Sequence, residues 1–159
     1  MLSAFTILHV IVSLVAIASG LFVAYQMLNS QFSPIWTLVF LATTALTSIT
    51  GFISPISGFT PGMAFGIVSL VALAVAIYAL YMRHLAGAWR WIYVVAALAA
   101  LYLNVFVLVT QSFQKIPALN ALAPKGTEPP FVVAQGIVLL AFVWLGYVAV
   151  KKFRSRSYR

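Results

Sequence analysis

Residues 131–159 read FVVAQGIVLLAFVWLGYVAVKKFRSRSYR. The first part of this stretch, 131–153, is almost entirely apolar. At about 1.5 Å per helical residue it is long enough to cross a hydrocarbon core of about 30 Å. The positive charges from Lys151 onward are typical of a cytoplasmic tail beside a membrane, where they are attracted to anionic headgroups. This stretch therefore predicts a transmembrane helix that ends in a basic membrane-surface segment, 151–159.

The same apolar pattern occurs four more times along the chain. Blocks of similar length cover 4–28, 34–53, 62–82 and 91–113. Of the 159 residues, 64% are apolar and only 6% are charged, whereas a soluble domain is about a quarter charged. We predict an all-α fold, in which a single domain, 1–159, forms an integral membrane bundle of five transmembrane helices. Short connections would make successive helices antiparallel neighbours.

The positions of Lys and Arg predict how the bundle is oriented. Seven fall on one side of the predicted bundle as membrane-surface residues: Arg83, Arg90, Lys151, Lys152, Arg154, Arg156 and Arg159. Only Lys115 and Lys125 fall on the other side, both in a predicted long loop, 114–130. Because cytoplasmic segments carry an excess of Lys and Arg, we predict a cytoplasmic C-terminus and an outside N-terminus. No basic and aromatic groove accompanies the tail, so the net charge of +8 does not indicate a nucleic-acid partner.

Polar residues inside the predicted spans are the first place to look for function, because an unpaired polar group is costly in hydrocarbon. With this orientation a candidate polar cluster lies in the outer half of the membrane: His9, Thr47, Thr50, Asn104, Gln111 and Gln135. Two interpretations remain open. The side chains could form hydrogen bonds between helices, or they could line a ligand pocket that opens to the outer surface.

The chain lacks residues that several kinds of chemistry need. The chain has no cysteine, and its single acidic residue, Glu128, lies outside every predicted span. We therefore predict no metal site and no catalytic residues, and a protein that is not an enzyme. His9 and His84 could suggest haem, but they fall at opposite membrane faces and could not both hold one haem. No cofactor is predicted, with haem or quinone as the alternative.

Four short runs carry a resemblance to other proteins. They are WRWIYV at 89–94, LNVFV at 103–107, QKIPAL at 114–119 and EPPF at 128–131. Over the last two thirds of the chain they are similar to an uncharacterised family of small polytopic bacterial membrane proteins. The resemblance implies a bacterial plasma membrane (the inner membrane), and it implies no activity and no functional residues.

These features favour a non-enzymatic membrane protein that acts as an accessory or scaffold subunit. Its partners would be the lipid bilayer and another membrane protein or a second copy of itself. The alternative is a binder of a lipophilic small molecule, such as a quinone, lipid or haem, in the outer-half polar cluster. A small channel or exporter is a weaker alternative, because the charged side chains that would line a pore are missing.

Overall fold

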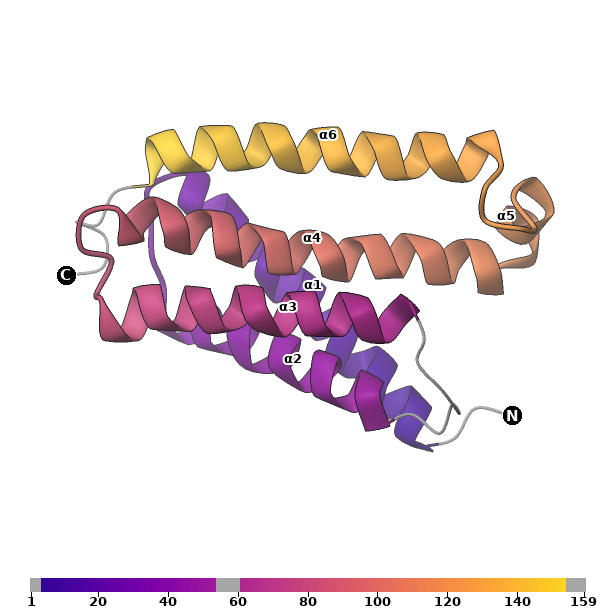
Figure 1. Ribbon diagram of the computed structural model, residues 1–159, viewed down its shortest axis with the longest axis horizontal. Coiled ribbons are helices and arrows are strands. Elements are labelled where there is room, and N and C mark those ends of the chain that lie inside the picture. The colour runs from indigo at the N-terminus through magenta and orange to yellow at the C-terminus, as the bar shows by residue number, and fades with distance from the viewer. Residues whose placement is uncertain (1–3, 54–60, 154–159) are drawn as a thin grey trace.

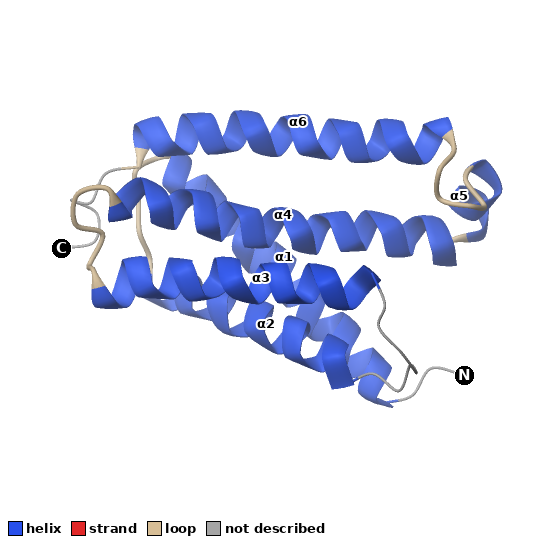
Figure 2. Ribbon diagram, in the orientation of Figure 1, coloured by secondary structure: helices blue, strands red, loops and turns tan. Residues whose placement is uncertain are grey.

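The computed structural model describes residues 4–53 and 61–153, and 87% of these residues are helical, with no strand among them (Figure 2). The elements in chain order are α1 (Ala4–Leu28), α2 (Pro34–Ile53), α3 (Pro61–Ile77), the π-helical η1 (Tyr78–Met82), α4 (Trp89–Lys115), α5 (Pro117–Leu122) and α6 (Pro129–Lys152). Within these described ranges, five segments are long and apolar enough to cross a membrane: α1, α2, α3 with η1, α4 and α6. The predicted helical membrane bundle is therefore confirmed.

The predicted spans agree with the helices to within two residues at each end. The prediction of a continuous loop over 114–130 was incomplete, because this segment contains α5. Pro117 occupies the first turn of α5, and Pro129 and Pro130 open α6. Proline is well suited to these positions, because the N–H that it lacks would have no partner in the first turn of a helix.

The five long helices run side by side with alternating direction, and α1 crosses behind the others (Figure 1). We call the end of the bundle that holds the turns 29–33 and 83–88 the Arg90 end. The opposite end, where α5 lies, is the His9 end. Helix α4 has the central position, because it contacts α1, α2, α3, α5 and α6.

The turn between η1 and α4 is tight. The Arg83 N–H donates to the Tyr78 carbonyl at 3.0 Å, which closes the π-helical turn. His84 and Leu85 then take left-handed backbone angles, with φ of 50° and 57°. Such angles cost about 1 kcal/mol or more for each non-glycine residue. The side chain of Leu85 is fully buried in the core, and this burial offsets the backbone strain.

The hydrophobic core lies toward the Arg90 end of the bundle. Large buried side chains of this core are Met27 of α1, Phe40 of α2, Leu80 of η1, Tyr93 and Leu101 of α4, and Phe153, which directly follows α6. Helix α6 contributes little to this core. Within α6 only Gln135 and Ala149 are buried, so α6 lies at the edge of the bundle and packs mainly against α4.

Candidate functional site

The six polar residues of the predicted cluster do not meet at one place. His9 on α1 contacts Thr50 on α2, with 2.7 Å between Nδ1 and Oγ1. The Thr50 hydroxyl donates its proton to the Leu46 carbonyl at 2.7 Å, with a second approach of 3.1 Å to the Thr47 carbonyl. Since that proton is used, the His9 ring donates from Nδ1 and Thr50 accepts. The pair joins α1 to α2 near the His9 end.

Asn104 and Gln111, both on α4, behave differently. The Asn104 amide donates to the hydroxyl of Thr44 at 3.2 Å, and this bond joins α4 to α2. Thr47, another member of the predicted cluster, is not its partner, and the buried Thr47 hydroxyl has no hydrogen-bond partner among the described residues. Gln111 is exposed on the surface of α4. The sequence correctly indicated polar residues inside the spans, but the rotation of each helix decides which of them meet.

Gln135 links α6 to α4. Its side-chain amide donates to the Phe106 carbonyl and to the Thr110 hydroxyl, both at 3.1 Å. Three polar contacts therefore cross three different helix interfaces, α1–α2, α2–α4 and α4–α6. This geometry is that of interhelical hydrogen bonds, which contribute about 1 kcal/mol each in membrane proteins. It does not gather the side chains around a shared cavity.

Replacing His9 with Gln is expected to leave the free energy of unfolding in detergent almost unchanged, because Gln keeps a donor for Thr50. Replacing His9 with Leu is expected to lower it by about 1 to 2 kcal/mol, because this hydrogen bond is lost. Thermal or denaturant unfolding of both variants measures the difference. Equal stability of the Leu variant and the wild type would show that the contact does not stabilise the bundle.

The predicted membrane-surface residues also have specific contacts. Arg90 on α4 donates from Nη1 to the carbonyls of Val150 and Phe153, at 2.6 Å each. These carbonyls lie at the end of α6, and the last carbonyls of a helix have no N–H partner within the helix itself. Arg90 therefore caps α6 across a chain separation of 60 residues or more.

Three more of these residues, Arg83, Lys151 and Lys152, lie at the same end. The Arg83 guanidinium lies over the Trp89 ring, 5.6 Å from its centroid. Lys151 and Lys152 are both exposed, and Lys151 also lies beside Tyr147. The predicted surface residues Arg154, Arg156 and Arg159 lie outside the described residues.

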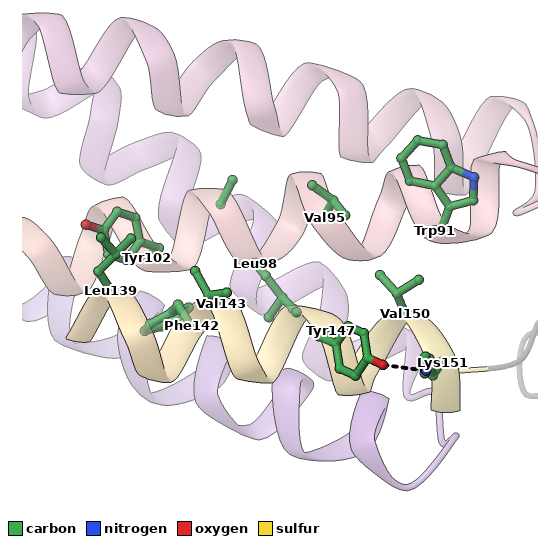
Figure 3. A pocket seen from close by; sticks show the side chains of 12 residues that line it. Trp91, Val95, Leu98, Tyr102, Leu139, Phe142, Val143, Tyr147, Val150 and Lys151 are labelled. Atoms are coloured by element: carbon green, nitrogen blue, oxygen red, sulfur yellow. Dashed lines mark hydrogen bonds between the residues drawn. The ribbon is translucent and has the colours of Figure 1, made fainter. Parts of the chain in front are cut away.

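A groove of about 580 Å³ lies between α4 and α6 (Figure 3). Its lining is almost entirely apolar: Trp91, Val95, Leu98, Ala99 and Tyr102 from α4, and Leu139, Phe142, Val143, Gly146, Tyr147, Val150 and Lys151 from α6. Figure 3 shows Trp91 and Lys151 at one end of the groove and Tyr102 and Leu139 at the other. Among the described lining residues, the only charged group therefore lies at the Arg90 end.

Contacts on both sides fix the position of this groove. Toward the His9 end the rings of Tyr102 and Phe142 meet edge to face, with 5.5 Å between centroids, and beyond them Gln135 bonds to α4. At the Arg90 end, Arg90 caps α6, and the rings of Tyr93 and Phe153 lie 6.1 Å apart. Helices α4 and α6 are therefore held together at both ends of the groove, and the groove lies between these two sets of contacts.

Two glycines show how the groove differs from the core. A Cβ on Gly20 of α1 would lie 2.5 Å from Leu101 and 2.8 Å from Phe40, so this glycine allows three helices to pack closely. A Cβ on Gly146, which lines the groove, would meet no atom within 4 Å. Glycine costs about 1 kcal/mol in a helix relative to alanine. No close contact among the described residues explains why position 146 is a glycine. Its missing side chain deepens the groove.

A smaller pocket, about 170 Å³, lies at the His9 end between α4, the loop after α5 and the start of α6. Glu128 orders this loop, because its carboxylate accepts hydrogen bonds from the N–H groups of Lys125 at 3.1 Å and Thr127 at 3.0 Å. Desolvation raises the pKa of Glu128, but the backbone N–H groups outweigh this effect and hold the pKa below its ordinary value. The carboxylate is therefore charged at neutral pH.

The sequence contained one sign of the groove. Trp91, Tyr147 and Lys151 have the composition of a membrane interface, where aromatic rings and long cations are enriched. That they face each other across one groove depends on how α6 packs on α4, which no spacing along the chain shows. No protein-family model, no curated protein and no solved structure matches this chain.

Proposed function

We propose that this membrane protein is a non-enzymatic binder of a lipid-like molecule, whose hydrocarbon chain lies in the groove between α4 and α6. The groove carries the proposal. Its volume of about 580 Å³ falls within the usual range for small-molecule sites, about 300 to 1,000 Å³, and its lining is apolar and aromatic. This proposal takes up one alternative from the sequence, a binder of a lipophilic molecule. It places the binding site in the groove and not in the polar cluster.

The length of the groove supports a lipid chain as the occupant. The lining residues of α4 run from Trp91 to Tyr102, about 16 Å at 1.5 Å per residue. Half of a hydrocarbon core of about 30 Å is about 15 Å. The groove therefore has the depth of one leaflet, with Trp91 and Lys151 at the interface and Tyr102 near the midplane. A transmembrane helix of a partner would extend well past the Tyr102–Phe142 contact.

A second candidate function is the accessory or scaffold subunit, and the outward surface of α6 favours it. Leu140 and Trp144 on this surface are more than 60% exposed. Trp144 lies only about 5 Å from the middle of α6 along the helix axis, whereas tryptophan in a membrane favours the interfaces. Tryptophan is also enriched where proteins contact each other. A second protein chain that co-purifies in fixed ratio would favour this candidate.

The proposal includes an orientation and a location. We place the Arg90 end at the cytoplasmic face of a bacterial plasma membrane, with the N-terminus outside. The excess of Lys and Arg at that end supports the orientation. The resemblance to small bacterial membrane proteins supports the location. In this orientation the groove opens within the inner leaflet.

Replacing Gly146 with Leu tests the proposal, because the new side chain would fill the groove without meeting an atom of the protein at its Cβ. Native mass spectrometry of protein purified in mild detergent is expected to show retained lipid on the wild type. The Leu variant is expected to retain it about tenfold more weakly, a loss of about 1.4 kcal/mol.

Gly136 provides the matched control. It is a glycine of the same helix with equally open surroundings, and it does not line the groove. The Gly136→Leu variant is expected to retain lipid like the wild type. If both variants retain as much lipid as the wild type, the groove does not bind it.

A further inference from the structure

We infer that the occupant of the groove is an anionic phospholipid, and that the ammonium group of Lys151 binds its phosphate. The inference rests on the proposed function of the groove and adds the chemical class of the head group. It comes from where the charges of the chain lie relative to the two ends of the groove.

Lys151 is held at the mouth of the groove. Its Nζ donates to the hydroxyl of Tyr147 at 2.6 Å and lies 4.3 Å from the centroid of the same ring (Figure 3). A lysine ammonium has three donors, and one of them is used here. The contact with Tyr147 places the charge over the groove and leaves donors for an anion at the level of the lipid headgroups.

The charge around this mouth is positive. Arg83, Arg90 and Lys152 lie at the same end of the bundle as Lys151. The only Asp or Glu of the chain is Glu128, which precedes the first residue of α6, whereas Lys151 is in its last turn. A helix of this length spans about 36 Å, so the carboxylate of Glu128 cannot neutralise Lys151. A phosphate at the mouth would supply the missing negative charge.

Arg90 and Lys151 have separate roles. The Arg90 guanidinium is bonded to the carbonyls of Val150 and Phe153 and is therefore committed to the end of α6. Lys151 is the charged residue that lines the groove. Trp91 and Tyr147 lie on either side of the mouth, as aromatic residues do at a membrane interface. The chain in the groove and the phosphate at Lys151 would belong to one lipid molecule.

The test compares two lipids with identical acyl chains, phosphatidylglycerol and phosphatidylcholine. Each is titrated into the full chain in mild detergent, and native mass spectrometry counts the bound molecules. The wild type is expected to bind phosphatidylglycerol about tenfold more tightly. In Lys151→Gln this preference is expected to fall to about twofold or less. Lys152→Gln has the same change in net charge on an exposed residue outside the groove, and it is expected to keep the preference.

The outcomes separate the head-group inference from the groove itself. Equal loss of preference in Lys151→Gln and Lys152→Gln would overturn the inference, because only the net charge would matter. If the wild type has no preference while Gly146→Leu weakens both lipids, the inference fails and the proposed function stands. If Gly146→Leu weakens neither lipid, the proposed function itself fails. Millimolar inorganic phosphate is expected not to displace phosphatidylglycerol, and displacement would overturn the assignment of a lipid phosphate.

Discussion

Replacing Arg90 with Met is expected to lower the free energy of unfolding by about 3 kcal/mol. The wild-type guanidinium donates to the carbonyls of Val150 and Phe153, and a hydrogen bond to a charged group contributes about 1.5 to 3 kcal/mol. Met keeps most of the apolar stem, so the loss reports the capping bonds. Reversible unfolding in mixed micelles measures it.

Lys152→Met is the control for Arg90→Met. It also removes one positive charge at the same end of the bundle, but from an exposed side chain of α6. We expect a change of less than about 0.5 kcal/mol, as for most surface substitutions. Similar losses in the two variants would mean that Arg90 acts through general charge and does not fasten α6 to α4.

Replacing Gly20 with Val is expected to destabilise the bundle by about 3 kcal/mol, the upper part of the range for overpacked cores. Its Cβ would lie 2.5 Å from Leu101 and 2.8 Å from Phe40, and both of these side chains are fully buried. Neither can move away without disturbing its own neighbours. The same unfolding experiment measures the effect.

The matched control is Gly146→Val, because its Cβ would meet none of the described atoms beyond its own stretch of helix within 4 Å. Its stability is expected to stay within about 0.5 kcal/mol of the wild type. Equal destabilisation by the two substitutions would contradict the distinction between a packing glycine and a groove glycine.

These two glycines also show what the sequence could predict. The lengths of the apolar blocks were sufficient to predict five helices, because crossing hydrocarbon imposes a minimum number of apolar residues. Gly20 and Gly146 look alike in the sequence, since each lies within such a block. Only the packing of α1 against α2 and α4 makes one of them essential to the core, and only the edge position of α6 leaves the other open.

The candidate site was predictable only in part. The sequence identified His9, Asn104 and Gln135 as polar residues within spans, and the structure gives each a partner on another helix. The sequence could not show that these hydrogen bonds lie at three different helix interfaces, because the rotation of each helix decides this. Arg90 was predicted to lie at the membrane surface from its position beside the start of a span. Its bond to α6 joins residues 60 or more positions apart, which local patterns do not report.

The central claim is that a lipid chain occupies the groove between α4 and α6, and photochemical cross-linking tests it most directly. The protein is reconstituted with a phosphatidylglycerol that carries a photoreactive group in its acyl chain, and the labelled residues are mapped by peptide mass spectrometry. We expect adducts to concentrate on groove residues such as Val95, Ala99 and Val143. Adducts spread at equal yield over lipid-facing residues outside the groove, such as Leu8 and Leu140, would contradict the account.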